Sequence, residues 1–153
     1  MPSPVVEQLD VRDQDTAEQV LAVQRAAYRA EADLIGSDRI PQLTESLEAL
    51  QARSLDWLGV RDGANRIVAA LAYTDDGATV DIDRLVVAPN SLRRGYGRAL
   101  VATLDSVRTA LVSTGRDNHP ARALYESLGF RKTHDEEVVS GLVITHFRRE
   151  AVT

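Results

Sequence analysis

Two glycines and three arginines occur within six residues of one another, just before a segment with helical periodicity. Gly95 and Gly97 let the main chain approach a ligand closely and expose amide N–H groups at the positive end of a helix dipole. Arg93, Arg94 and Arg98 add positive charge beside those amides. The combination predicts an anion site, and a pyrophosphate group is the ligand that such a site fits.

Three other interpretations of this stretch compete with a pyrophosphate site. A dinucleotide-binding GxGxxG motif is excluded because Leu100 occupies the position of its third glycine. An arginine–glycine segment for nucleic acid is disfavoured by the acidic chain as a whole, whose net charge is -5. A glycine-containing turn with solvated arginines stays open from these residues alone.

The composition removes several classes of chemistry. The 153 residues include no cysteine, which excludes a disulfide framework, a thiolate metal site and a cysteinyl intermediate. No Gly-x-Ser-x-Gly nucleophile elbow occurs in the sequence. The three histidines, His119, His134 and His146, are scattered and lack the spacing of metal ligands, so no metal is predicted.

The elements that must position this stretch begin with a strand and two helices. Val5–Leu9 is β-like, and Asp15 and Thr16 offer N-caps for a helix that Gly36 is placed to end. A second helix is expected to begin at Pro41, because leucines then recur at helical spacing.

From Trp57 onward the period changes to that of strands. The runs WLGV, RIVAALAY and TVDIDRLVV are separated by turn signals and predict an antiparallel meander of three strands. The remaining expected elements are a helix from Pro89 to Val107, a strand at TALVST, a helix over Ala121–Leu128 capped by Gly129, and two strands between Phe130 and Glu150 joined at Ser140 and Gly141.

This order of elements neither alternates strictly nor separates strands from helices. It predicts a mixed α/β (α+β) fold with a central, largely antiparallel sheet of about seven strands and four helices on both of its faces. The strand–helix–strand unit from Val80 to Thr114 is a crossover, so its two strands are expected to be parallel. The length and the hydrophobic content of 44% suit one domain over residues 1–153.

Two longer segments resemble a known family. DIDRLVVAPNSLRRGYGRAL and DNHPARALYESLGF are similar to the paired signatures of the GNAT superfamily of acyl-CoA-dependent N-acetyltransferases, over a region from about Trp57 to Phe130. The family's phosphate motif, Q/R-x-x-G-x-G/A, is filled by residues 92–97, with Leu92 in place of the usual Gln or Arg. The second signature is present as Asn118, Ala121, Leu124, Tyr125, Gly129 and Phe130.

The resemblance implies a GNAT-like fold and acetyl-CoA as the cosubstrate. Because main-chain N–H groups hold most of the pyrophosphate in this family, Leu92 is expected to weaken binding, not to abolish it, and Arg93 is placed to compensate. Val87 would pair with the pantetheine amides as an added strand, and Asn118 would cap its helix and bind the pantetheine arm. The expected cofactor-binding residues are Leu85, Val86, Val87, Leu92, Arg93, Arg94, Gly95, Tyr96, Gly97, Arg98, Asn118 and Tyr125.

The resemblance also implies catalytic roles. An amine with a pKa of ~10.4 must lose a proton, which costs about 4.6 kcal/mol at pH 7, and Asp81 aligns with a general-base position of the family. Asp83, a chain of water, or two merely solvated aspartates are the alternatives. A main-chain N–H at Leu85 or Val86, freed from sheet pairing at a bulge or a splay of this strand, would stabilise the oxyanion. Tyr125 would protonate the leaving thiolate, unless it is a packing tyrosine.

These residues predict direct transfer of an acetyl group to a primary amine in a ternary complex. The acceptor is expected to be a small-molecule or peptide amine, and Glu31, Asp33 and Asp38 either attract it or are solvated charges. A catalytically silent acetyl-CoA sensor or an interaction module is the alternative function. The longest apolar run, Ile67 to Tyr73, is far shorter than the ~20 residues of a membrane span, so a cytoplasmic protein without a membrane partner is expected. The net charge of -5 argues against a nucleic-acid partner. A monomer or a homodimer is expected.

Overall fold

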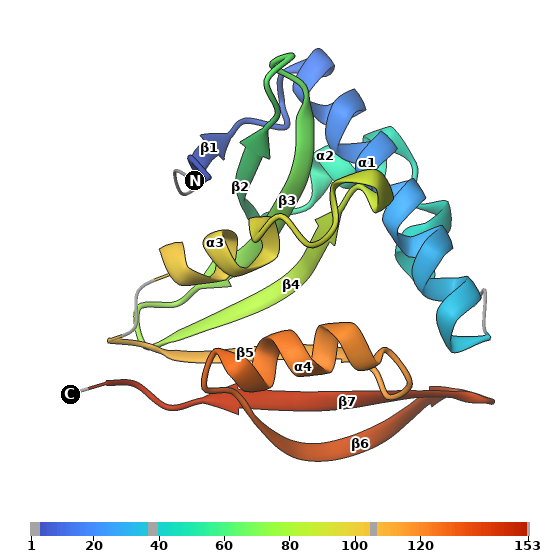
Figure 1. Ribbon diagram of the computed structural model, residues 1–153, viewed down its shortest axis with the longest axis vertical. Helices are drawn as coiled ribbons and strands as arrows, with labels where there is room; N and C mark the ends of the chain where they lie inside the picture. The colour runs from blue at the N-terminus through green and yellow to red at the C-terminus, as the bar shows by residue number, and fades with distance from the viewer. Residues whose placement is uncertain (1–3, 37–39, 105–106, 153) are drawn as a thin grey trace.

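A computed structural model of the chain describes residues 4–36, 40–104 and 107–152. Their seven strands form one sheet, flanked by four α-helices (Figure 1). The strands are β1 (Glu7–Leu9), β2 (Asp56–Arg61), β3 (Ile67–Asp75), β4 (Thr79–Val87), β5 (Thr109–Gly115), β6 (Arg131–Val139) and β7 (Leu142–Arg149). The helices are α1 (Gln14–Ile35), α2 (Leu47–Ala52), α3 (Tyr96–Thr103) and α4 (His119–Ser127), with short 3-10 turns η1 (Pro41–Thr44) and η2 (Pro89–Ser91). The predicted mixed fold class is confirmed.

The strands are ordered β1-β2-β3-β4-β5-β7-β6 across the sheet. All neighbouring pairs of described strands are antiparallel except β4 and β5, which the crossover through α3 makes parallel, as predicted. The parallel pairing joins only residues 79–81 of β4 to residues 109–111 of β5. Beyond these residues the two strands diverge, and Figure 1 shows β4 rising away from β5 toward α1.

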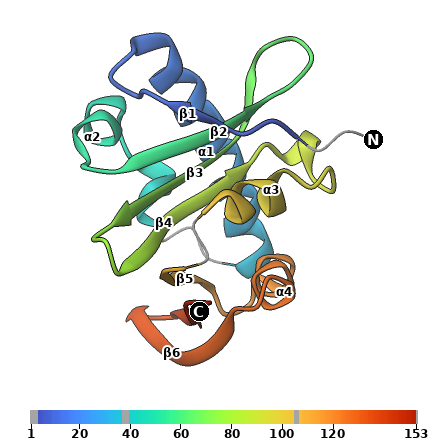
Figure 2. The same ribbon diagram turned by 90° about the vertical axis from the view of Figure 1, so that its left-hand side faces the viewer.

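Two cores lie on opposite faces of the sheet. α1 and α2 pack on one face, where Val20, Leu50 and Trp57 are buried. α3 and α4 pack on the other face, where Leu100 and Phe130 are buried. Figure 2 shows α2 on one side of the sheet and α3 with α4 on the other. The prediction that helices cover both faces is therefore confirmed.

The ends of α1 follow from side-chain and backbone capping. Asp13 is the N-cap, because its carboxylate accepts a hydrogen bond from the Thr16 N–H at 3.0 Å. The prediction of Asp15 or Thr16 as the N-cap was wrong, because the carboxylate of Asp13 satisfies the first turn and both residues already belong to the helix. Gly36 ends the helix as predicted, with a φ of 70° that L-residues rarely adopt.

Two other helices differ from the prediction. The expected second helix is divided into η1 and α2, because the Ser46 hydroxyl caps a new helix by accepting from the Ala49 N–H at 3.1 Å. The helix expected to reach Val107 ends at Thr103. Residues 105–106 lie outside the described residues. Both differences leave the positions of the strands as predicted.

Leu100 provides a test of the core beneath α3. Its side chain is fully buried, so Leu100→Ala is expected to lower the free energy of unfolding by about 2–5 kcal/mol. Leu34→Ala makes the same chemical change at a side chain that is 52% exposed and is expected to cost less than about 1 kcal/mol. Urea denaturation of both variants measures the difference, and equal losses would show that the α3 core is assigned incorrectly.

Candidate active site between strands β4 and β5

β4 leaves β5 near a β-bulge. Ala72 and Tyr73 of β3 lie opposite Arg84 and Ile82, so Asp83 is the extra residue of β4. Ile82 belongs to the core beneath α3 and α4, whereas Arg84 contacts the α1 side of the sheet. The sequence resemblance implied a bulge or a splay in this strand, and the structure has both.

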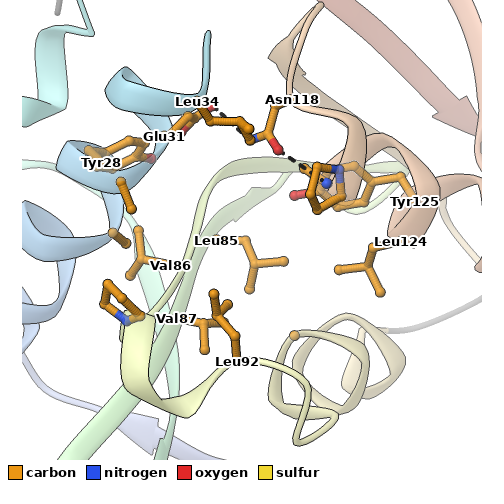
Figure 3. Close-up of a pocket in the computed structure, with 16 residues that line it drawn as sticks. Tyr28, Glu31, Leu34, Leu85, Val86, Val87, Leu92, Asn118, Leu124 and Tyr125 are labelled. Atoms are coloured by element: carbon orange, nitrogen blue, oxygen red, sulfur yellow. Dashed lines mark hydrogen bonds between the residues drawn. The ribbon is translucent and has the colours of Figure 1, made fainter. Parts of the chain in front are cut away.

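A groove of about 260 Å³ opens where the two strands diverge (Figure 3). Its walls are mostly apolar and come from α1, β4, α4 and the turn before α3. Seven of the residues predicted to bind the cofactor line this groove: Leu85, Val86, Val87, Leu92, Gly97, Asn118 and Tyr125. The fold therefore brings together residues that are up to 40 positions apart in the sequence.

Residues 92–98, which we call the Gly–Arg turn, lead into the first turn of α3 at one end of the groove. Arg93 and Gly95 have positive φ angles of 64° and 78°, and Gly95 is the N-cap of α3. The N–H groups of the following turn have no intrahelical acceptor. A Cβ atom on Gly97 would lie 3.2 Å from Leu124 Cδ2 and 3.6 Å from Leu85 Cδ2. Glycine at this position therefore keeps the entrance of the groove open.

The arginines of this turn differ in their surroundings. Arg93 and Arg94 are exposed, and neither forms an ion pair with another described residue. Arg98 donates from Nη2 to Ser127 Oγ at 2.7 Å, which ties α3 to the end of α4. Tyr96 is half-buried against the core. Two cationic side chains thus remain available to an anion beside the N-terminus of α3.

Asn118 links α4 to α1. Its Oδ1 accepts from the Ala121 N–H at 3.2 Å, which confirms its predicted role as the N-cap of α4. Its Nδ2 donates to Glu31 Oε1 at 3.1 Å, and the Thr114 hydroxyl donates to the same oxygen at 3.4 Å. Figure 3 shows Glu31 of α1 beside Asn118. The predicted contact with pantetheine stays a prediction.

Tyr125 lies deep in the groove with only 4% of its surface exposed. Its ring packs edge-on against Phe130, with 5.7 Å between the ring centroids, and tilted against Phe147 at 6.1 Å. Burial raises the pKa of Tyr125, and the nearby charge of Glu31 raises it further. The hydroxyl is therefore protonated at neutral pH.

Two more cavities adjoin the groove. An inner cavity of about 80 Å³ is lined by residues that include Asp83, Thr114 and Tyr125. An outer pocket of about 270 Å³ lies between α1 and the hairpin of β6 and β7. Tyr28 and Glu31 line the groove, the inner cavity and the outer pocket, so the three share walls. We call the groove, the inner cavity and the outer pocket together the passage.

The two aspartates of β4 have different positions relative to the passage. Asp81 and Asp83 both line a further cavity of about 390 Å³ beside Arg53. Asp83 also lines the inner cavity and the outer pocket, whereas Asp81 lines no part of the passage. Partial burial raises the pKa of Asp81, the charge of Asp83 raises it further, and His146 acts in the opposite direction. The base role of Asp81 stays a prediction.

Arg84 is a buried cation that the sequence analysis missed. Its Nη1 donates to Gln24 Oε1 at 2.8 Å and to Glu45 Oε1 at 2.7 Å, while its Nε donates to Asp83 at 2.6 Å. The guanidinium lies 5.7 Å from the centroid of the Trp57 ring. The only signal in the sequence is an arginine at a buried position of an alternating strand.

Two of the three histidines meet although they are far apart in the sequence. His134 of β6 and His146 of β7 are paired in register, and their rings stack at 4.4 Å. Glu136 Oε1 lies 2.8 Å from His146 Nε2, and the possible donor atoms of the three residues lie within 4.8 Å of one another. The prediction that the histidines are scattered was wrong for His134 and His146. None of the three residues lines the passage.

Among the described residues, no helix has the length and apolar character needed to cross a bilayer.

A curated relative, the UPF0157 protein YqkA of Bacillus subtilis (strain 168), is 32% identical over 147 residues. The match covers 94% of this chain and 43% of that protein, so the chain spans less than half of its relative's length.

Solved structures share the fold. The ribosomal-protein-S18-alanine N-acetyltransferase of Escherichia coli superposes with a TM-score of 0.74 at 17% identity, covering 99% of this chain and 96% of that one. The PaiA N-acetyltransferase of Thermoplasma acidophilum, solved in complex with coenzyme A, gives a TM-score of 0.71 at 17% identity, covering 95% and 98%.

Sequence identities of 17% show a shared fold but do not assign the chain to a family. A family model makes that assignment. The model of the acetyltransferase (GNAT) domain matches residues 55–132, just over half of the chain. The matched region contains β4, the Gly–Arg turn, α3 and α4, which together form most of the groove. The chain therefore belongs to the GNAT acetyltransferase domain family.

Proposed function

We propose that this protein is an N-acetyltransferase that moves the acetyl group of acetyl-CoA directly to a primary amine. The observation that carries the proposal is the passage, in a chain of the GNAT family: the turn predicted to bind an anion borders the groove at one end, and the outer pocket lies at the other. Two substrates entering from these two ends would meet at the inner cavity, as a ternary complex requires.

The groove suits the long arm of acetyl-CoA. The pyrophosphate would bind the first N–H groups of α3, with Arg93 and Arg94 as cationic neighbours. The pantetheine chain would lie against the apolar walls, and its amides would pair with the β4 main chain that β5 leaves free. Leu92, at 56% exposure, replaces the side chain that the family usually supplies here.

The chemistry would take place in the inner cavity. A main-chain N–H near Leu85 or Val86, just after the bulge, would stabilise the oxyanion formed from the thioester. Tyr125, which is protonated and lines this cavity, would give its proton to the leaving thiolate. Because Asp81 lies outside the passage, its predicted role as the base would need a chain of water molecules.

Acetyl-CoA binding tests the cofactor part of the proposal. Gly97→Val adds atoms where a Cβ is already 3.2 Å from Leu124, so calorimetry is expected to show at least about a tenfold loss of affinity. Gly63→Val is the matched control, because no atom lies within 4 Å of a Cβ at that exposed glycine. Equal affinities in the two variants would place the cofactor elsewhere.

Tyr125→Phe tests the general acid. The variant keeps the packing against Phe130 and Phe147 but removes the hydroxyl, so kcat should fall about ten- to a hundredfold. The dissociation constant of acetyl-CoA should change much less than kcat, because the ring that lines the groove is kept. Thiol release with an amine acceptor measures kcat, and an unchanged kcat would remove the assigned role.

Asp81→Asn separates a stability effect from a catalytic one. Because folding raises the pKa of Asp81, the protonated carboxyl stabilises the fold below the unfolded-state pKa of ~3.9. This stabilisation is lost as pH rises through the pKa of the folded state. The variant should therefore be more stable than wild type at pH 7, by less than about 0.5 kcal/mol because the carboxylate is partly solvated, and no more stable in acid.

The same variant also decides the base. We expect turnover by Asp81→Asn to fall less than about tenfold, because Asp81 lies outside the passage. A loss of a hundredfold or more, with acetyl-CoA binding intact, would instead support the role predicted for Asp81.

A further inference from the structure

The outer pocket combines an apolar wall with a polar inner end. Five apolar side chains from α1, the segment before η1 and the β6–β7 hairpin form the wall: Ile35, Ile40, Val138, Leu142 and Ile144. The inner end, where the pocket meets the inner cavity, holds Tyr28, Glu31 and Asp83. A molecule that fills this pocket therefore places an apolar body outside and one polar group inside.

Glu31 is the carboxylate of the passage for which the described residues supply no cationic partner. The other carboxylate, Asp83, is neutralised by Arg84 at 2.6 Å and by Arg53 at 3.5 Å. Glu31 accepts hydrogen bonds from two neutral groups, Asn118 and Thr114, and forms no ion pair with any residue in the described part of the chain. An ammonium ion stabilises a partly buried carboxylate of this kind more than it stabilises an exposed one, because water screens the attraction less.

We propose that the outer pocket binds a primary amine with a single positive charge on an apolar group, and that Glu31 binds the ammonium and accepts its proton. This inference rests on the proposed function. Glu31 is suited to the role because it lines the outer pocket, the inner cavity and the groove, and therefore borders both the acceptor and the place expected for the thioester.

The charges of the passage also limit the acceptor. A second cation would lie among the apolar side chains of the wall, where the described residues of the lining supply no counter-ion, and this is costly. A carboxylate next to the amine would meet Glu31 and Asp83. Arg84 would not compensate, because Asp83 and Glu45 already balance its charge. Diamines and free amino acids should therefore be poor acceptors.

The proton transfers balance without any further reactant. Glu31 takes one proton from the ammonium, and the neutral nitrogen attacks the carbonyl carbon of the thioester to form the C–N bond. The C–S bond then breaks, and the thiolate takes the proton of the Tyr125 hydroxyl. The nitrogen of the new amide then gives a second proton to the Tyr125 phenolate, which restores the hydroxyl. Glu31 releases its proton to water. One proton is released for each amide formed.

The charge of Glu31 couples these two residues. While Glu31 is ionised, it helps to hold the pKa of Tyr125 above its usual value. Once Glu31 has accepted the proton of the amine, that influence disappears, and Tyr125 becomes a stronger acid as the thiolate forms. Burial, the larger cause of the raised pKa of Tyr125, remains, and the loss of the Glu31 charge favours protonation of the leaving group after the acceptor is deprotonated.

The test measures thiol release from acetyl-CoA with two matched pairs of amines. Pentylamine and 1,5-diaminopentane differ by a second cation, and leucinamide and leucine differ by a carboxylate. We expect kcat/KM at least about tenfold higher for the first member of each pair, a difference of about 1.4 kcal/mol. Equal or reversed preferences would overturn the proposed acceptor class.

Glu31→Gln and Asp33→Asn test the residue. Asp33 is an exposed carboxylate two positions further along α1, so its variant removes the same charge outside the passage. Glu31→Gln should lose at least about a hundredfold in kcat/KM for pentylamine, and Asp33→Asn should stay within about twofold. Equal effects of the two variants, or full activity of Glu31→Gln, would refute the role of Glu31.

Acetyl-CoA affinity, measured by calorimetry, distinguishes the possible failures. We expect wild type and Glu31→Gln to bind acetyl-CoA equally, which also shows that the variant is folded. Ile144→Ser changes only the wall of the outer pocket and should raise KM for pentylamine with the same acetyl-CoA affinity. Turnover of the diamine or of leucine as fast as its matched partner would overturn this inference alone, whereas binding of acetyl-CoA by wild type without turnover of any amine would also overturn the proposed transfer. Absence of binding would overturn the proposed function with it.

Discussion

The separation of β4 from β5 is the constraint on which the site depends. Their parallel pairing ends at Asp81 and Leu111, and the bulge at Asp83 follows at once. A ladder that continued to the ends of both strands would leave no space between α1, β4 and α4. The groove, the inner cavity and the outer pocket all lie along this opening. The unpaired main chain of β4 is therefore both a cost to the fold and a surface for a ligand.

Arg84 anchors the α1 side of the opening. Its fully buried guanidinium joins Gln24 of α1, Glu45 after η1 and Asp83 in the bulge. Loss of one partner would leave a buried charge incompletely compensated, so these segments have a strong preference for one arrangement. The same contacts neutralise Asp83. As a result, among the described residues Glu31 is the carboxylate of the passage without a cationic partner. The contacts of Arg84 that hold the fold together therefore also set the charge of the site.

The features that the sequence predicts well are local ones. The strand runs, the left-handed glycine that ends α1 and the Asn118 cap of α4 each depend on residues within a few positions. The start of α1 was misplaced because Asp13 and Asp15 are both good caps, and local sequence does not rank them. The contact between Asn118 and Glu31 spans 87 positions, and that between Arg84 and Gln24 spans 60. No local pattern contains such pairs, so the role of Arg84, and the distinction between Glu31 and the exposed Asp33, become visible only in the folded chain.

A crystal structure of the protein with bound acetyl-CoA tests whether the passage holds the cosubstrate. We expect the diphosphate on the N–H groups at the start of α3, the pantetheine arm between β4 and β5, and the thioester in the inner cavity between Glu31 and Tyr125. Coenzyme A bound on another surface, or a β4–β5 opening that stays empty at saturating acetyl-CoA, would contradict it.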